Sequence, residues 1–203
     1  QGAPGPDQDS RGRGPGGQPA PVVAILWGMD DAARELYLLR HGKSSWDSDA
    51  ASDFERPLAG RGKRDAPRMG AWLGEQGVVF SRVVSSPAKR ARRTAVKALE
   101  AAGMDPEAVV WDGRVYGAEV ADLLAVLADC PGPGPVLLVG HNPGLDDLLG
   151  HLCGPGAGAR GDGKAMTTAA VARLRLPAGD WSRLPPGCGE LLALVRPGDL
   201  ARD

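Results

Sequence analysis

Two histidines and two arginines stand at or shortly after the ends of apolar runs, in three separate stretches of the chain. Arg40 and His41 belong to LLRHGKSSWD, Arg90 to SSPAKRARRTA and His141 to VLLVGHNPGL. Guanidinium groups bind phosphoryl oxygens through paired hydrogen bonds and stay charged at any working pH. A neutral imidazole is a good nucleophile toward phosphorus. The four side chains together therefore predict phosphoryl chemistry.

These residue types can carry such a reaction without further groups. If one imidazole is neutral and attacks, the second, in its protonated form, would stabilise charge on the equatorial oxygens. Phosphoryl transfer depends mainly on positioning and charge stabilisation, so we expect no metal and no other cofactor. A lone histidine at a strand end is more often a packing or capping residue. The catalytic interpretation of His41 and His141 therefore depends on their occurring together with Arg40 and Arg90.

The segments that carry these residues alternate between strand-like and helix-like patterns. Apolar runs predict strands over 35–40, 78–86, 108–111, 135–140, 170–176 and 190–197, with helical patterns between the first four and after 140. This alternation predicts an α/β protein, a three-layer α/β/α sandwich with a mostly parallel central sheet. The carboxyl ends of parallel strands meet at one edge, so the four side chains should share one pocket. Gly42 would let the backbone approach closely there.

The composition limits the classes of partner and the organisation of the chain. The 203 residues hold 24 basic and 25 acidic side chains, which gives no global attraction to nucleic acid or to an anionic membrane. Residues 1–30, rich in Gly and Pro at their start, are predicted to be a disordered N-terminal extension, and 31–203 a single domain. No apolar stretch approaches the roughly 20 residues of a membrane span, so we expect a cytoplasmic protein.

The three cysteines are Cys130, Cys153 and Cys188, and they form no CxxC pair. Their odd number and wide spacing argue against a disulfide framework or a zinc site. They are predicted to be free thiols.

Four stretches in this order resemble the histidine phosphatase superfamily, with its phosphoglycerate-mutase-like fold. They are LLRHGKSSWD, RPLAGRGKRDAPRMGAWL, SSPAKRARRTA and VLLVGHNPGL, and the resemblance covers about residues 35–197. The short span between the third and fourth stretches leaves no room for a large cap domain. Together with MTTAAVARLRL near the C-terminus, this is similar to the SixA-type phosphohistidine phosphatase branch.

The resemblance implies a role for each matching residue. His41 would be the nucleophile that becomes transiently phosphorylated, and Arg40 and Arg90 would clamp the phosphoryl oxygens. His141 would donate a hydrogen bond to the same oxygens, and Ser44 would place a hydroxyl near the phosphate. The resemblance therefore implies a metal-independent phosphatase that works through a phosphohistidine intermediate.

The leaving group separates two substrate classes. Many relatives that act on oxygen esters carry an acid near the stretch matching DGRVYGAEVADLL, where Glu119 and Asp112 are candidates and neither matches cleanly. An imidazole leaving group, with a pKa of about 6.5, departs far more easily than an alkoxide. A weak or missing acid therefore favours phosphohistidine in a protein, although Glu119 could serve. The alternatives are a small phosphomonoester or sugar phosphate, or a non-catalytic phosphate-binding protein. The oligomeric state stays open.

Overall fold

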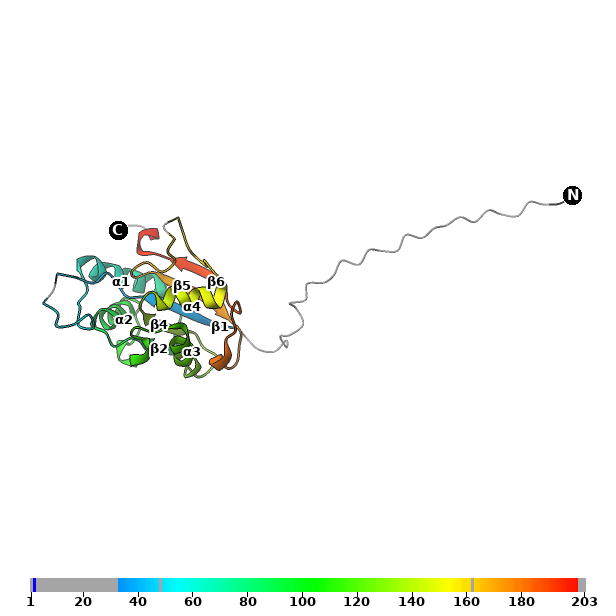
Figure 1. Cartoon of the computed structure of the whole chain (residues 1–203), viewed down its shortest axis with the longest axis horizontal. Helices are drawn as coiled ribbons and strands as arrows, with labels where there is room; N and C mark the ends of the chain where they lie inside the picture. Colours follow the sequence, from blue (N-terminus) through cyan, green and yellow to red (C-terminus); the bar gives the residue numbers. More distant parts are fainter. Residues whose placement is uncertain (1, 3–32, 48, 162, 201–203) are drawn as a thin grey trace. The chain divides into compact units, whose positions relative to one another are not determined.

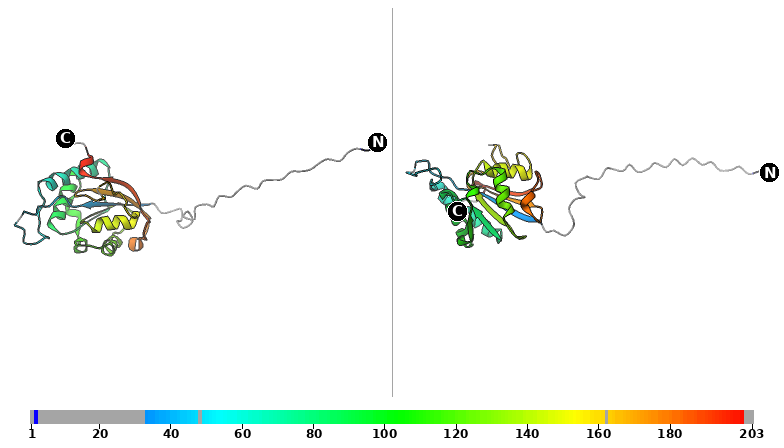
Figure 2. Two further views of the ribbon diagram at one scale, coloured as in Figure 1. Left: turned by 45° about the horizontal axis from the view of Figure 1, so that its top comes forward. Right: turned by 60° about the horizontal axis from the view of Figure 1, so that its bottom comes forward.

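A mixed sheet between two pairs of helices is the main feature of the described residues, as Figures 1 and 2 show. The computed structural model describes residues 2, 33–47, 49–161 and 163–200. The six strands lie in the order β3-β2-β4-β1-β5-β6. The strands are β1 (Arg34–Arg40), β2 (Arg82–Ser85), β3 (Val109–Trp111), β4 (Val136–Gly140), β5 (Val171–Leu176) and β6 (Glu190–Val195); the helices are α1 (Gly60–Glu75), α2 (Lys89–Ala101), α3 (Val120–Ala128) and α4 (Gly144–Cys153).

The mostly parallel sheet expected from the sequence is confirmed. β1 pairs in parallel with β4, and β2 pairs in parallel with both β4 and β3. The last two strands differ, because β5 is antiparallel to β1 and β6 is antiparallel to β5. A parallel connection usually crosses over through an α-helix, and the segment between β5 and β6 holds only the three-residue 3₁₀ helix Trp181–Arg183.

The two faces of the sheet bury separate apolar clusters, which makes the expected three layers. Leu36 and Leu38 of β1 pack in the cluster that includes residues of α3 and α4. Tyr37 and Leu39, which point to the opposite face, pack in the cluster that includes residues of α1 and α2. This alternation is the period-2 pattern of a strand buried on both sides.

One expected strand is too long. The run 78–86 forms a strand only over β2, and Val79 is 81% exposed. Val78 and Phe80 pack against the α1–α2 cluster without pairing in the sheet, so their apolar character reflects packing alone.

The described residues of 31–203 form one compact unit. The predicted disordered extension, residues 1–30, lies outside the described residues apart from Gly2 and stays a prediction. Within the described chain, no helix has the length and apolarity to cross a bilayer.

The turn after β1 packs directly on the first turn of α1. A methyl group at Gly42 would lie 3.1 Å from the Cα of Gly62, and one at Gly62 would lie 2.3 Å from the carbonyl oxygen of Lys43. The sequence analysis assigned Gly42 to a close approach of the backbone at the phosphate pocket, which stays a prediction; what the structure shows is a close approach of Gly42 to the backbone of α1. This contact fixes the turn that carries His41.

We expect Gly62→Ala to lower the free energy of unfolding by about 2 kcal/mol, because the methyl group would overlap backbone atoms that have no free space to move into. Equilibrium unfolding in urea measures the change. Gly150→Ala is the matched control, since Gly150 lies inside α4 with nothing within 4 Å of the added carbon. It should gain about 0.5–1 kcal/mol in helix propensity. Equal effects of the two variants would contradict the packing argument.

Candidate active site

The ends of two adjacent strands bring the two histidines together. Arg40 lies opposite Gly140 in the parallel β1–β4 ladder, and the backbone N–H of His41 donates to the carbonyl of Gly140 at 3.0 Å. His41 and His141 therefore leave the sheet side by side, with ring centroids 5.0 Å apart. Both side chains are buried. The expected convergence at the sheet edge is what the structure shows.

The hydrogen bonds of His41 leave one ring nitrogen available. Its Nδ1 lies 2.7 Å from the carbonyl oxygen of Gly42, which can only accept, so we assign the proton to Nδ1 and the lone pair to Nε2. Burial, reinforced by the charges of Arg90, Arg40 and Arg56, lowers the pKa of His41 to about 4. At neutral pH the ring is therefore in the uncharged, nucleophilic form.

His141 is held from the end of β2. Its Nε2 lies 2.8 Å from the hydroxyl oxygen of Ser86, a fully buried residue just after that strand. Its Nδ1 is buried and makes no hydrogen bond with the described residues. Burial, with the neighbouring charges of His41 and Arg90, lowers the pKa of His141 to about 3. The sequence analysis predicted a protonated second imidazole in the transition state, which stays a prediction; the low pKa describes His141 in the unliganded protein.

Arg90 and Arg40 reach the site from different elements. Arg90 lies in the first turn of α2 and is buried, while Arg40 ends β1 and donates to the carbonyl of Met166 at 2.7 Å. Thr94, one turn after Arg90, donates to the carbonyl of Arg90 at 2.7 Å and accepts from the backbone N–H of Gly42 at 3.0 Å. This hydroxyl ties α2 to the turn that carries His41.

Arg56 is a third guanidinium at the site, and the sequence reasoning did not assign it. It donates to the hydroxyl of Ser44 at 2.8 Å and to the carbonyl of Ser45 at 2.9 Å, and it stacks on Trp46. Ser44 was expected to contact phosphate, and in the structure its hydroxyl supports Arg56. The available signal was the position of this arginine at the start of RPLAGRGKRDAPRMGAWL.

Asp53 was also missed, and it is the counterion of the arginines. Its carboxylate accepts from Arg56 at 2.7 Å, from Arg90 at 2.8 Å and from the hydroxyl of Tyr116 at 2.9 Å. These hydrogen bonds, that of Arg56 first, hold the pKa of Asp53 far below its usual range. The ring of Tyr116 in turn packs edge-on against His141 at 5.5 Å. The carboxylate of Asp53 thus occupies hydrogen-bond donors of Arg56 and Arg90.

The two candidate acids differ in position. Asp112 is bound by Arg114 through both carboxylate oxygens, and this interaction lowers the pKa of Asp112. Glu119 is exposed and lines a cavity of about 590 Å³ together with His141 and the backbone turn 142–144. The structure therefore places Glu119 and His141 at the same cavity, while Asp112 is engaged by Arg114.

No three His, Cys, Asp or Glu side chains gather into a metal-binding group within the described residues. The three cysteines are free thiols.

Comparison with known proteins identifies the family. The model of the histidine phosphatase superfamily (branch 1) matches residues 36–113. The phosphohistidine phosphatase SixA of Escherichia coli is 31% identical over 144 residues, which are 70% of this chain and 85% of that protein. The chain belongs to the histidine phosphatase superfamily. The resemblance seen in the four sequence stretches is thereby confirmed.

Two further comparisons extend the match. An uncharacterized protein of Mycobacterium tuberculosis is 33% identical over 164 residues, which are 78% of this chain and 99% of that protein. The solved structure of the protein histidine phosphatase SixA complexed with tungstate matches with a TM-score of 0.62 and 29% identity, covering 82% of this chain and 99% of that one. This histidine phosphatase is similar to SixA in sequence and in fold, and its activity class is that of a phosphatase, a hydrolase.

The shifted pKa of His41 can be measured by NMR titration of the histidine ring protons. We expect a midpoint of about 4 in place of the ordinary 6.5, because burial and three arginines disfavour the imidazolium. The unfolded chain binds this proton near 6.5, so the free energy of unfolding should fall as the pH decreases from 6.5 to 4. His41→Ala assigns the resonance. Arg90→Gln should raise the midpoint, and Arg183→Gln, in the 3₁₀ helix at the opposite end of the sheet, should not. A midpoint at or above 6.5 in the wild type would refute this electrostatic account.

Asp53→Asn should bind inorganic phosphate about fivefold more tightly, because it removes a carboxylate that repels the anion and competes for Arg90. Competitive inhibition of phosphatase activity by phosphate gives the affinity. Asp180→Asn is the matched control, since Asp180 caps the 3₁₀ helix at the opposite end of the sheet. A loss of affinity in Asp53→Asn would mean that the carboxylate mainly orients the arginines.

Proposed function

We propose that this histidine phosphatase removes phosphate from phosphohistidine in a protein, through a phosphorylated His41 and without a metal ion. The observation that carries the proposal is the neutral His41, with Nε2 free to attack, inside a pocket of guanidinium groups. The roles are those implied by the family: His41 is the nucleophile, and Arg40, Arg90 and His141 hold the phosphoryl oxygens. Arg56 joins them because its charge acts on His41.

In the first step the Nε2 lone pair of His41 forms a bond to phosphorus while the bond from phosphorus to the substrate nitrogen breaks. The electron pair of the broken bond stays on the substrate imidazole. A substrate ring that carries a proton on its second nitrogen leaves as neutral imidazole, so no proton donor is needed at the broken bond. The guanidinium groups stabilise the charge on the three equatorial oxygens during the transfer.

In the second step water hydrolyses the phosphorylated enzyme. The water oxygen bonds to phosphorus, the bond to Nε2 breaks, and its electron pair returns to His41. The proton of the water passes to solvent. The sum of the two steps converts phosphohistidine and water into histidine and phosphate.

His141 changes role when the dianionic phosphoryl group binds. In the unliganded protein its low pKa keeps it neutral, and a neighbouring dianion favours the charged form of a histidine. Its Nδ1, which is buried and has no hydrogen-bond partner among the described residues, is then the ring atom left to donate to the phosphoryl oxygen. Ser86 fixes the opposite side of the ring through Nε2.

A second candidate function keeps the mechanism and replaces the substrate by a small phosphomonoester. It is favoured by the position of Glu119, which lines the cavity beside His141 and could protonate an alkoxide leaving group. A non-catalytic phosphate-binding protein is disfavoured, because His41 and His141 lie 5.0 Å apart between ring centroids and the charges of Arg40 and Arg90 act on His41, which suits catalysis as well as binding. We propose the same cytoplasmic location that the sequence analysis expected.

The deciding experiment compares phosphate release from a histidine-phosphorylated protein with release from a panel of small phosphomonoesters. We expect a higher kcat/KM on the phosphoprotein, a loss of at least about a thousandfold in His41→Ala, and a phosphoenzyme that this variant cannot form. The rate should be unchanged in EDTA.

If a small ester is hydrolysed faster than the phosphoprotein, and Glu119→Gln loses this activity, the substrate is a small phosphomonoester and not phosphohistidine. A strict requirement for a divalent metal would overturn the proposed mechanism. Absence of a phosphoenzyme in the wild type would overturn the role of His41.

A further inference from the structure

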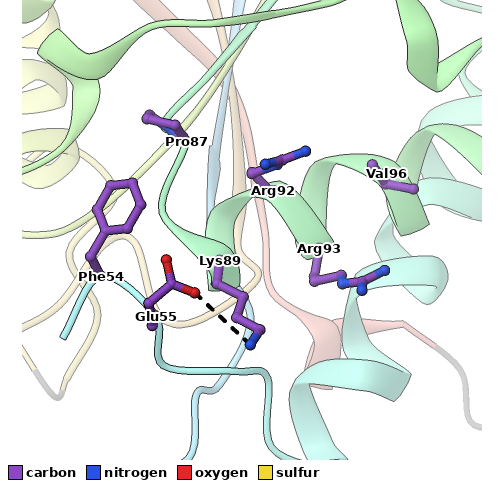
Figure 3. Close-up of a pocket in the computed structure, with 7 residues that line it drawn as sticks. All are labelled: Phe54, Glu55, Pro87, Lys89, Arg92, Arg93 and Val96. Carbon is purple, nitrogen blue, oxygen red and sulfur yellow. Dashed lines mark ion pairs between the residues drawn. The ribbon is translucent and has the colours of Figure 1, made fainter. Parts of the chain in front are cut away.

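A second cavity lies on the outer side of α2, next to the phosphate pocket. It has a volume of about 350 Å³ and is shown in Figure 3. Cationic side chains project into it from α2, and the facing wall comes from the loop that carries Asp53. We call it the basic groove; its lining residues are Phe54, Glu55, Pro87, Lys89, Arg92, Arg93 and Val96.

The positive charges that line the basic groove outnumber the negative charges that line it. Lys89 lies 4.0 Å from the carboxylate of Glu55, and both side chains are half exposed, so the pair is weak. The guanidinium of Arg92 lies 4.9 Å from the ring centroid of Trp111, a cation–π contact that leaves its charge in place. Arg93 has no ion-pair partner among the described residues. Three cations therefore face one carboxylate.

These cations do not stabilise the helix on which they stand. Lys89, Arg92 and Arg93 lie in the first turns of α2, which holds no acidic residue in its first turn. The N-terminal end of a helix carries partial positive charge, so cations there are unfavourable. All three side chains are exposed, so the core does not need them either. Binding of an anionic partner accounts for a charge pattern that stability does not.

The basic groove adjoins the phosphate pocket through one aromatic wall. The ring of Phe54 packs edge-on against Tyr116 at 5.1 Å, and Tyr116 packs in the same way against His141. The preceding residue, Asp53, binds Arg90, while the backbone N–H of Lys89 donates to the carbonyl of Phe54 at 3.0 Å. The lining residues of the groove lie on both sides of Arg90 in the sequence, with Pro87 and Lys89 before it and Arg92, Arg93 and Val96 after it.

We propose that the basic groove binds an acidic segment, rich in Asp and Glu, that flanks the phosphorylated residue of the protein substrate. This inference rests on the proposed function and specifies its substrate. A chain that places its phosphoryl group between Arg90 and His41 would pass over Phe54 and lay its carboxylates against Arg92 and Arg93. Phe54 and Val96 supply apolar contact for the carbon atoms of the same segment.

The test uses two phosphohistidine peptides that differ only in the flanking segment, which holds glutamates in one and glutamines in the other. Turnover is measured with the wild type, and binding of fluorescently labelled peptides with His41→Ala, which retains the groove. We expect His41→Ala to bind the glutamate peptide about fivefold more tightly, with the preference shrinking at high salt. Arg93→Glu in that background should abolish the preference. Arg183→Glu, an equal charge reversal in the 3₁₀ helix at the opposite end of the sheet, should retain it.

The outcomes separate this inference from the function beneath it. Equal binding of the two peptides, or a preference that Arg183→Glu also loses, would overturn the groove, and turnover of both peptides would still support the phosphohistidine proposal. Hydrolysis of small esters but of neither peptide would overturn the proposed substrate, whatever the binding shows. Tighter binding of the glutamate peptide that requires Arg93 establishes the groove.

Discussion

Three guanidinium groups held close to one buried histidine are the constraint on which this protein depends. Cations so close together repel one another, and burial strengthens this repulsion because less solvent is present to screen it. Each is therefore fixed by acceptors: the carbonyl of Met166 for Arg40, the loop oxygens of Ser44 and Ser45 for Arg56, and Asp53 for Arg90. Asp53 also accepts from Arg56, so one carboxylate holds two of the three charges.

Burial and the same charges together set the protonation of the histidines. Burial is the larger cause of the low pKa values of both imidazoles, and the cations that a phosphoryl pocket needs to bind its anion add to it. The result suits a nucleophile, which must be uncharged to attack. In the proposed mechanism it also delays the protonation of His141 until the substrate brings negative charge, which would couple binding and transition-state stabilisation through one ring.

The sequence predicted the parts of this site that follow regular elements. Arg40, His41 and His141 follow the ends of predicted strands, and Arg90 lies at the start of the helix predicted after Pro87. Apolar periodicity locates these strands and helices, and the carboxyl ends of parallel strands lie at one edge of the sheet. Asp53 and Arg56 lie in a loop whose path is set by hydrogen bonds between side chains. No periodic pattern in the sequence indicates such hydrogen bonds. The lowered pKa of His141 in the unliganded protein was not predicted for a related reason: it depends on burial and on neighbours that only the folded chain supplies. The strand over 78–86 was overextended because partial burial of Val78 and Phe80 resembles sheet pairing in a sequence.

Helix α2 shows how the fold can separate chemistry from recognition. Its residues of one face, Arg90 and Thr94, serve the phosphate pocket and the turn after β1, and Ala91, Ala95 and Ala98 are buried. Lys89, Arg92 and Arg93 belong to the remaining face and line the basic groove. Arg92, two residues after Arg90, points in nearly the opposite direction, while Arg93, three residues after Arg90, lies at the border between the two faces. If the basic groove binds an acidic flanking segment as proposed, substitutions at Arg92 or Arg93 would change which flanking sequence is bound while Arg90, which is buried, keeps its hydrogen bonds to Asp53. Specificity would then change through two exposed positions without moving the atoms that the proposed mechanism uses.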